Sequence, residues 1–373
     1  MSPHAYLDLE RPWLSERLVA WPILASGELR PESALSVKVF GLPLLLVRGA
    51  DGRVSAHIDA CPHRLVSFSC AGKPPLVEGS VVRCPYHYQK FDQAGRCVQT
   101  LHGETGTSEH LVTLPMRDWG GFLWLPAGRS LFEAGDPAAW QTPEVQAALQ
   151  EARLPAEFDR ELLDPARIDV LPLFHYRYPV GSWGLVLTSG IDHTHGFHVH
   201  AIARTIHQLR RWMGQETLSG MHMVCDDDER SVLVTYTQYR DNMQAYWKVG
   251  AAPNLWLNKL DEGLYLSVIF VPEDAGSTTL RGTLYAGGHW RSLLENMPAL
   301  KGLRDLSNRN NEEDRPFIES QVALMGGGRI PVGNASINDA PVYRFFRYLE
   351  AITGSAVHYG AKPHPRDLLV QPR

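Results

Sequence analysis

Two cysteine–histidine pairs constrain the fold of this chain more than any other feature. The pairs are Cys61-Pro-His63 and Cys84-Pro-Tyr-His87, and 20 residues separate them. Each pair lies between short segments that read as β-strands, so each belongs to a loop, and two such loops can close over a metal from opposite sides. Two thiolates and two imidazoles suit either a tetrahedral zinc ion or a [2Fe–2S] cluster with two histidines on one iron.

The distribution of these ligands favours the cluster. Zinc sites with two cysteines and two histidines more often group the cysteines in one pair and the histidines in the other. Here each loop supplies one cysteine and one histidine. An asymmetric cluster needs this arrangement, because one iron takes a cysteine from each loop and the other iron takes a histidine from each. Zinc stays open as the alternative reading.

The chain around the pairs predicts two domains. Residues 18–125 read as short strands broken by turns such as Asp51-Gly52, and a stretch rich in proline, glycine and alanine follows at 126–141. Thr142-Pro143 then predicts a helix start, with a hydroxyl cap and proline at the first helical position. We expect an all-β domain over residues 1–130, with its metal loops at about 55–100, and a second domain over 131–373.

The second domain is expected to be α+β. Longer alternating segments predict an antiparallel sheet, and helical patterns accompany them. The strand segments are 171–178, 231–239, 264–271 and 278–285, and the helical patterns are 182–195, 291–309 and 313–325.

Composition excludes several functional classes. The chain has 36 Lys+Arg against 41 Asp+Glu, a net charge of −5, and its basic residues are scattered, so no nucleic-acid partner is expected. The longest apolar stretch, 39–47, is too short to span a membrane, and the N-terminus lacks an apolar signal segment. Five cysteines are an odd number, which argues against a disulfide framework. A soluble cytoplasmic protein is expected.

A second candidate metal site lies where four of the 16 histidines fall within residues 191–200. Asp192 and His195 are three residues apart and would share a helix face. Gly196 can end that helix and let the chain turn, which would bring His200 back to the same centre. Spacing alone leaves two alternatives open as ligands, His193 and His198.

A non-heme Fe(II) centre that binds O2 uses two histidines and one carboxylate and leaves other positions open. The remaining ligand must come from another part of the chain. The best candidate is Asp314, in the segment 311–321. Glu312 and Glu313 compete with it, because acids at a helix start are usually there to complement the helix dipole.

Both halves of the chain resemble the Rieske non-heme iron oxygenases. Several segments resemble a Rieske [2Fe–2S] domain over residues 20–125: Leu46-Val-Arg48, Asp51-Gly52, Cys61-Pro-His-Arg64, Cys84-Pro-Tyr-His87, Phe91-Asp92 and Gly95. The family usually has glycine where this chain has Leu65, and Gly-Trp where it has Tyr88-Gln89. The segment from Asp192 to His200 resembles that family's iron motif, and Asp314 with Glu319 and Gln321 resembles the segment that carries its aspartate ligand.

The resemblance is to oxygenase α-subunits of the smaller monooxygenase and O-demethylase type. It implies a catalytic domain with a helix-grip (START-like) antiparallel sheet around an apolar pocket, and a head-to-tail homotrimer. Cys61, His63, Cys84 and His87 would hold the cluster, and His195, His200 and Asp314 would hold mononuclear Fe(2+). Asp192 would then bridge the two centres, hydrogen-bonded to His195 and to a cluster histidine, rather than ligate iron.

The expected activity is O2-dependent hydroxylation, or O- or N-dealkylation, of a small aromatic or heterocyclic molecule. Gly326–Gly333 neither follows a strand nor opens a helix as a dinucleotide loop must, so electrons would come from a separate NAD(P)H-dependent reductase, with or without a ferredoxin. A desaturase or oxidative cyclase is an alternative with the same cofactors. A non-catalytic Rieske electron carrier is the rival class, although a bare carrier would need only the first 125 residues.

Overall fold

The computed structural model describes residues 15–354 with gaps, and their contacts divide them into two compact units. One unit is Leu18–Ala152, and the other comprises the described residues of Met1–Arg17 and Arg153–Arg373. The residues that are not described are 1–14, 16, 71, 73, 101, 104–108, 135–136, 153, 155–162, 164–167, 182, 192–194, 196–198, 213–221, 229–230, 239–242, 250–251, 262, 275, 326–347, 350 and 355–373. In the described part of the chain, no helix is long and apolar enough to cross a membrane.

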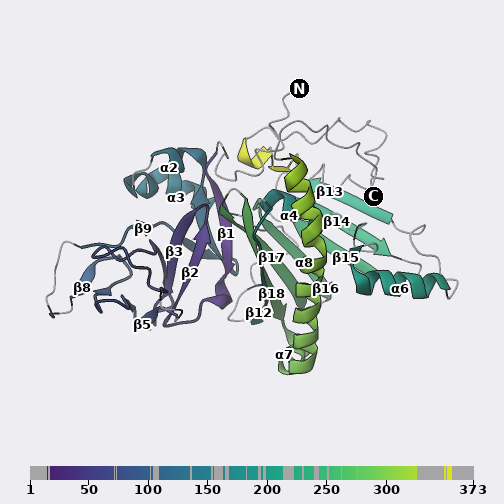
Figure 1. The fold of residues 1–373 in the computed structure, drawn as a ribbon, viewed down its shortest axis with the longest axis horizontal. Coiled ribbons are helices and arrows are strands. Elements are labelled where there is room, and N and C mark those ends of the chain that lie inside the picture. Colours follow the sequence, from purple (N-terminus) through teal and green to yellow (C-terminus); the bar gives the residue numbers. More distant parts are fainter. Residues whose placement is uncertain are drawn as a thin grey trace. The chain divides into compact units, whose positions relative to one another are not determined.

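Short antiparallel sheets build the N-terminal unit, as the sequence predicts (Figure 1). The described strands form sheets in the orders β1-β11-β10, β2-β3-β4-β9 and β5-β6-β7-β8. Their bounds are β1 Val19–Ala25, β2 Ser33–Val39, β3 Leu42–Arg48, β4 Val54–Ile58, β5 Leu76–Glu78, β6 Val81–Arg83, β7 Lys90–Phe91, β8 Cys97–Gln99, β9 Thr113–Leu114, β10 Arg117–Trp119 and β11 Phe122–Ala127.

The apolar stretch at 39–47 contains the turn of a hairpin, because β2 ends at Val39 and β3 begins at Leu42. Phe40 and Gly41 have positive φ angles of 52° and 80°, and Val39 pairs with Leu42 across the turn. Two consecutive residues with positive φ are typical of the tight turns that match the twist of paired strands. The sequence does not reveal this turn, because phenylalanine is not a residue that usually adopts the positive φ that such turns require.

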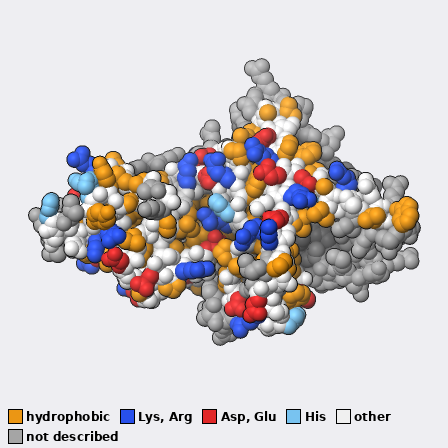
Figure 2. All heavy atoms as spheres, turned by 60° about the horizontal axis from the view of Figure 1, so that its bottom comes forward, with side chains coloured by type: hydrophobic (Ala, Val, Ile, Leu, Met, Phe, Trp, Pro, Cys, Tyr) orange, Lys and Arg blue, Asp and Glu red, His pale blue; other side chains and the backbone are white. Residues whose placement is uncertain are grey.

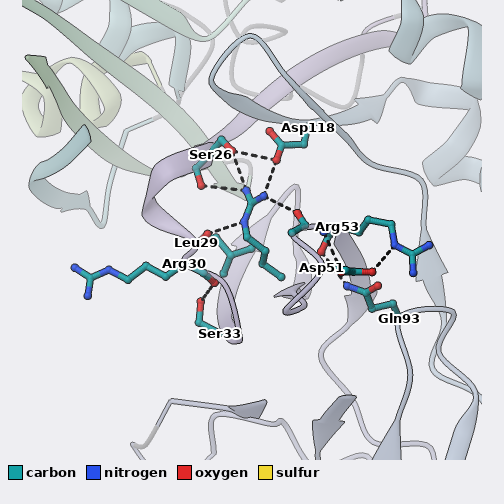
Figure 3. Close-up of polar contacts among 10 residues, drawn as sticks. Ser26, Leu29, Arg30, Ser33, Asp51, Arg53, Gln93 and Asp118 are labelled. Carbon is teal, nitrogen blue, oxygen red and sulfur yellow. Dashed lines mark hydrogen bonds and ion pairs between the residues drawn. The ribbon is translucent and has the colours of Figure 1, made fainter. Parts of the chain in front are cut away.

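A buried arginine, Arg48, ties several parts of this unit together, and its partners Ser26, Leu29 and Asp118 are labelled in Figure 3. Arg48, at the end of β3, donates to the backbone oxygens of Leu29 at 2.7 Å and Gly52 at 2.8 Å, and to the Ser26 hydroxyl at 2.8 Å. Its guanidinium also pairs with the Asp118 carboxylate of β10 at 2.8 Å. The rigid fork of arginine donors suits such a many-sided contact, so Arg48 has a structural role.

Three short helices form the C-terminal end of the N-terminal unit. They are α2 Arg129–Ala134, the 3-10 helix η3 Pro137–Gln141 and α3 Pro143–Gln150. The Thr142 hydroxyl accepts a hydrogen bond from the Val145 N–H at 3.5 Å, which confirms the predicted helix start. These helices belong with the compact unit that ends at Ala152, whereas the sequence places residues from 131 onward in the second domain.

A long antiparallel sheet forms the C-terminal unit, in the order β12-β18-β17-β16-β15-β14-β13 among the described residues. The strands are β12 Asp169–Tyr178, β13 His222–Asp228, β14 Ser231–Gln238, β15 Met243–Val249, β16 Leu255–Asp261, β17 Leu264–Asp274 and β18 Ser277–Ala286. The four predicted strand segments correspond to β12, β14, β17 and β18. A buried apolar cluster that includes Leu173, Leu284 and Leu300 joins this sheet to the helices.

The helices of this unit only partly match the sequence-based expectation. They are α4 Trp183–Ile191, α6 Ala201–Trp212, the 3-10 helix η6 Gly288–Trp290, α7 Arg291–Glu295 and α8 Met297–Met325. The expected helix at 182–195 ends at Ile191. The two patterns expected at 291–309 and 313–325 are wrong as separate helices, because α8 runs through both, with Pro316 inside it. In Figure 1 this long helix lies across the sheet, and α8 and α4 contact each other.

The surface carries mixed charge. On the face drawn in Figure 2, acidic and basic side chains are interspersed among apolar ones over the described residues. This agrees with the scattered basic residues of the sequence.

Candidate metal centres

The two cysteine loops of the N-terminal unit share one backbone design. The Cys61 N–H donates to the Val66 oxygen at 2.9 Å, and the Leu65 N–H donates back to the Cys61 oxygen at 2.7 Å. In the second loop the Cys84 N–H donates to the Gln89 oxygen at 2.9 Å, and the Tyr88 N–H donates to the Cys84 oxygen at 3.1 Å. Each loop therefore closes on itself around its cysteine with the same spacing.

The fourth residue after each cysteine adopts a left-handed backbone. Leu65 has a φ angle of 55° and Tyr88 a φ angle of 60°. These are two positions where the sequence departs from the glycine usual in Rieske domains. Side chains other than glycine are unfavourable in this conformation. The hydrogen bonds of the two loops therefore hold a backbone that these residues would not choose by themselves.

The four candidate cluster ligands converge. The Nδ1 atoms of His63 and His87 lie 3.1 Å apart, and their rings meet edge to face with centroids 4.6 Å apart. Cys61 and Cys84 are both buried, and their sulfurs interact. This interaction lowers the pKa of Cys84 to about 6 and, together with burial, raises that of Cys61.

This donor set fits a [2Fe–2S] cluster. Two buried sulfurs and two imidazole nitrogens, one of each from either loop, are the ligands that a Rieske cluster takes. Asp59 supports the first loop, because its carboxylate accepts from the Phe68 N–H and the Ser67 hydroxyl, each at 2.8 Å. The buried carboxylate of Asp59 therefore stabilises the backbone of the first loop.

In the C-terminal unit the structure brings together His195, His200 and Asp314. One ligand atom of each lies within 4.8 Å of the others. The Asp314 Oδ1 atom is 3.3 Å from His195 Nε2 and 3.7 Å from His200 Nε2. All three side chains are largely but not fully buried. Two imidazoles and one carboxylate are the facial set of non-heme Fe(II) sites, so this donor set fits that ion.

Three separate elements supply this trio. His195 lies in the turn after α4, His200 directly precedes α6, and Asp314 lies in α8. The Val199 N–H donates to the His195 oxygen, and the Arg204 N–H of α6 donates to the His200 oxygen, both at 2.8 Å. Asp192, His193 and His198 lie outside the described residues.

The two competing carboxylates lie elsewhere. Glu313 Oε2 accepts from the Ala201 N–H at 3.1 Å and lies 3.2 Å from His200 Nδ1. It therefore sits behind His200 and leaves the opposite nitrogen of the ring facing Asp314. Glu312 is exposed and lies 3.9 Å from Arg315. Sequence reasoning did not find the contact of Glu313 with His200, because the two residues are 113 positions apart.

A buried tyrosine anchors α8 just ahead of Asp314. The Tyr178 hydroxyl lies 3.1 Å from both the backbone and the side-chain oxygen of Asn311, and the Asn311 amide donates to the Ser307 oxygen at 2.9 Å. Burial and the nearby charge of Asp314 raise the pKa of Tyr178, so it remains a neutral donor. The contact between Tyr178 of β12 and Asn311 holds one turn of α8 against β12, and Asp314 lies in the next residues of that helix.

Comparison with known proteins gives the N-terminal unit a family. Residues 20–108 match the Rieske [2Fe–2S] domain. The 4beta-methylsterol monooxygenase of Methylococcus capsulatus is 33% identical over 117 residues, which are 30% of either chain. The oxygenase component of dicamba O-demethylase from Stenotrophomonas maltophilia is 34% identical over 119 residues, 31% of this chain and 34% of that one. The matched segment thus spans about a third of each of these relatives.

Longer but weaker similarity continues into the second unit. Cholesterol 7-desaturase of Bombyx mori is 29% identical over 199 residues, 48% of this chain and 43% of that one. The crystal structure of dicamba monooxygenase bound to dicamba has a TM-score of 0.61 at 18% identity and covers 91% of this chain and 97% of that chain. At this identity the likeness concerns the fold. The chain therefore carries a Rieske [2Fe–2S] domain and has the fold of the oxygenase α-subunits of the Rieske non-heme iron oxygenases, the family that its sequence resembles.

Proposed function

We propose that this chain is the oxygenase component of a Rieske-type system, which hydroxylates or O- or N-dealkylates a small aromatic or heterocyclic molecule with O2. The observation that carries the proposal is that one chain holds two distinct donor sets. One unit offers two cysteines and two histidines, and the other offers two histidines and a carboxylate. A non-catalytic electron carrier has no use for the second set.

In this proposal Cys61, His63, Cys84 and His87 hold the cluster. His195, His200 and Asp314 hold Fe(2+). When bound, the cluster transfers one electron at a time and the mononuclear iron activates O2. Hydroxylation of a methyl group on oxygen or nitrogen yields an unstable hemiacetal or hemiaminal, so hydroxylation and dealkylation are two outcomes of one reaction.

The residues around the second centre orient its ligands. Glu313 accepts at the Nδ1 side of His200, which fixes the ring and its tautomer. The same carboxylate accepts the Ala201 N–H and so ties His200 to the start of α6. Tyr178 holds the α8 turn in place. For Asp192 we propose the role that the family resemblance implies, a carboxylate bridge between His195 and a cluster histidine.

Two aromatic rings of the sheet pack against the last turn of α4. Gly190, in the last turn of α4, faces the rings of Phe270 and Trp256, and a Cβ added there would lie 3.6 Å and 3.8 Å from them. These two rings are tilted against each other with centroids 6.5 Å apart.

The proposed electron source is a separate NAD(P)H-dependent reductase, with or without a ferredoxin. Turnover with such a reductase, 18O2 and a panel of methoxy- and N-methyl-substituted aromatics tests the activity. The proposal expects product formation in which the new oxygen, or the formaldehyde released, carries 18O. Reduction of the cluster without oxygen incorporation into any substrate would favour the electron carrier.

Desaturation is a second candidate. The similarity to cholesterol 7-desaturase extends beyond the Rieske domain, over nearly half of this chain. The same experiment separates the two reactions, because a desaturated or oxidatively cyclised product has lost two hydrogens and gained no 18O.

We also propose a homotrimer in which the cluster of one subunit serves the iron of the next, as the family resemblance suggests. Two inactive variants test it: His87→Ala lacks the cluster and Asp314→Ala lacks the mononuclear iron. Co-expression yields mixed trimers, which mass measurement can verify. Cross-subunit transfer predicts partial recovery of turnover, because some interfaces pair a working cluster with a working iron. Mixed trimers without activity would rule this route out.

A further inference from the structure

A buried glutamine links the two cysteine loops. Gln89 is 6% exposed and lies where the Rieske family usually has tryptophan. Its backbone oxygen accepts from the Cys84 N–H at 2.9 Å, within its own loop. Its side-chain oxygen Oε1 accepts from the thiol of Cys61, which lies in the other loop, at 3.5 Å. One side chain therefore touches the sulfur of a candidate cluster ligand.

A carboxylate fixes the orientation of this amide. Glu109 Oε2 lies 2.5 Å from Gln89 Nε2. An ionised carboxylate only accepts hydrogen bonds, so the amide must present its NH2 group to Glu109 and its carbonyl oxygen to Cys61. Glutamine oxygen and nitrogen are otherwise interchangeable by rotation, and Glu109 removes that freedom. The backbone oxygen of Glu109 accepts from the Cys97 N–H at 3.1 Å, which holds the carboxylate in position.

The effect of the Gln89 oxygen on the Cys61 sulfur changes when Cys61 ligates iron. A thiol donates a proton to the Gln89 oxygen, but a thiolate ligand has no proton to donate. The same geometry then directs the negative end of the amide dipole at the sulfur. Reduction adds negative charge to the cluster, and a negative dipole in a buried setting opposes that change.

We propose that Gln89, held in place by Glu109, lowers the reduction potential of the cluster. Gln89 acts on the sulfur directly, and Glu109 is a positioning residue that acts through Gln89. The inference rests on the proposed role of Cys61 as a cluster ligand. A lower potential makes the cluster a stronger electron donor to the mononuclear centre and a weaker acceptor from the reductase, so this pair would set the balance between the two transfers.

Redox titration of the purified holoprotein at fixed pH tests the proposal. Glu109→Gln removes the charge and frees the Gln89 amide to turn its NH2 group toward the sulfur. We expect the midpoint potential to rise by the equivalent of about tenfold in the one-electron reduction equilibrium, 59 mV. Gln89→Leu removes the dipole and should also raise the potential. Glu78→Gln is the control, because Glu78 is an exposed carboxylate of β5 that pairs with Arg83 and Lys90, and it should cause no shift.

The double variant Gln89→Leu/Glu109→Gln tests the linkage between the two residues. If Glu109 acts through Gln89, the double variant matches Gln89→Leu alone. Strictly additive shifts would overturn that linkage, and unchanged potentials in both single variants would overturn the proposal. Visible absorption and iron content are measured on each sample. A wild-type protein without a cluster would refute the proposed function instead, and the two failures are therefore distinguishable. If one single variant does not assemble a cluster, the other still decides.

Discussion

The two candidate metal centres of this chain are built in different ways. The first uses two short loops in the N-terminal unit, each closed by the same pair of backbone hydrogen bonds around its cysteine. The second combines a turn between α4 and α6 with a residue of α8, more than 100 positions later in the sequence. The first centre is therefore encoded locally in two short motifs, whereas the second depends on how a long helix packs across a sheet.

This difference explains what the sequence could and could not predict. Spacing predicts Cys61, His63, Cys84 and His87 as candidate ligands directly, because each loop carries its own cysteine and histidine, and the structure brings the four together. For the second centre, the sequence alone did not separate Asp314 from the neighbouring carboxylates Glu312 and Glu313 as the third ligand. The structure distinguishes the three carboxylates because helix phase and the Tyr178 contact turn Asp314 toward the histidines.

The largest expected effect separates the two centres completely. We expect His87→Ala to lose the visible absorption of the cluster and keep the mononuclear iron, and Asp314→Ala to lose the mononuclear iron and keep the cluster. The reason is that the ligands of each centre come from one unit. Iron and sulfide analysis with visible spectra measures both losses. A full cluster spectrum in His87→Ala would contradict the ligand assignment.

Asp192→Asn extends this comparison to the residue that we propose bridges the centres. If Asp192 bridges them without holding either metal, the variant should retain all of its iron and turn over poorly. Loss of one iron would make Asp192 a ligand and would reopen the role of Asp314.

A buried histidine makes the N-terminal unit sensitive to acid. His57 lies between the hydroxyls of Thr113 and Ser55, each at 3.0 Å, and burial lowers its pKa to about 4. An unfolded histidine binds a proton near pH 6.5, so between pH 6.5 and 4 the unfolded state holds more protons. Stability is then fully present above pH 6.5 and falls by up to about 3 kcal/mol as the pH drops to 4.

His57→Gln measures this contribution. The difference in unfolding free energy between the wild type and this variant should shrink as the pH falls from 7.5 to 4.5. His175 in β12 also has a lowered pKa, because it is partly buried and lies near Arg281. It provides the comparison in the C-terminal unit. A difference for His57→Gln that does not change with pH would show that the site is not a buried neutral histidine.

A smaller effect concerns the second centre. Glu313→Ala should weaken iron binding by about 10–100-fold, the usual cost of losing a group that orients a metal-bound histidine. Glu312→Gln is the matched control and should leave iron affinity unchanged, because Glu312 is exposed. Competition with a chelator measures both. Complete loss of iron in Glu313→Ala would instead point to Glu313 as a ligand.

The smallest effect returns to the cluster loops. Leu65→Gly relieves a left-handed backbone that costs about 1–2 kcal/mol, and glycine loses about 0.5–1 kcal/mol more in backbone entropy on folding. Leu65 is 77% exposed, so little packing is lost. We expect the unfolding free energy to stay equal or rise slightly. Leu65→Val should lower it, because a β-branched residue tolerates positive φ poorly. Destabilisation by Leu65→Gly beyond about 2 kcal/mol would contradict this account.

Much of the fold followed from local patterns, and the exceptions have physical causes. The sequence indicated β12, β14, β17 and β18 as strands, and β17 and β18 are buried over most of their length rather than alternating between buried and exposed positions. The break expected between 309 and 313 did not occur, since tertiary contacts of α8 with β12 carry the helix through an acidic segment and Pro316. The Gln89 contact was also beyond sequence reasoning, because it joins residues from separate loops.

The most direct test of the central claim is the metal and sulfide content of the purified, reconstituted chain. The account predicts three irons and two acid-labile sulfides per chain, with one iron lost selectively in Asp314→Ala. Two irons and two sulfides, unchanged by that substitution, would leave only the cluster and support an electron carrier. Zinc in place of iron, in a colourless protein, would contradict the assignment of both centres.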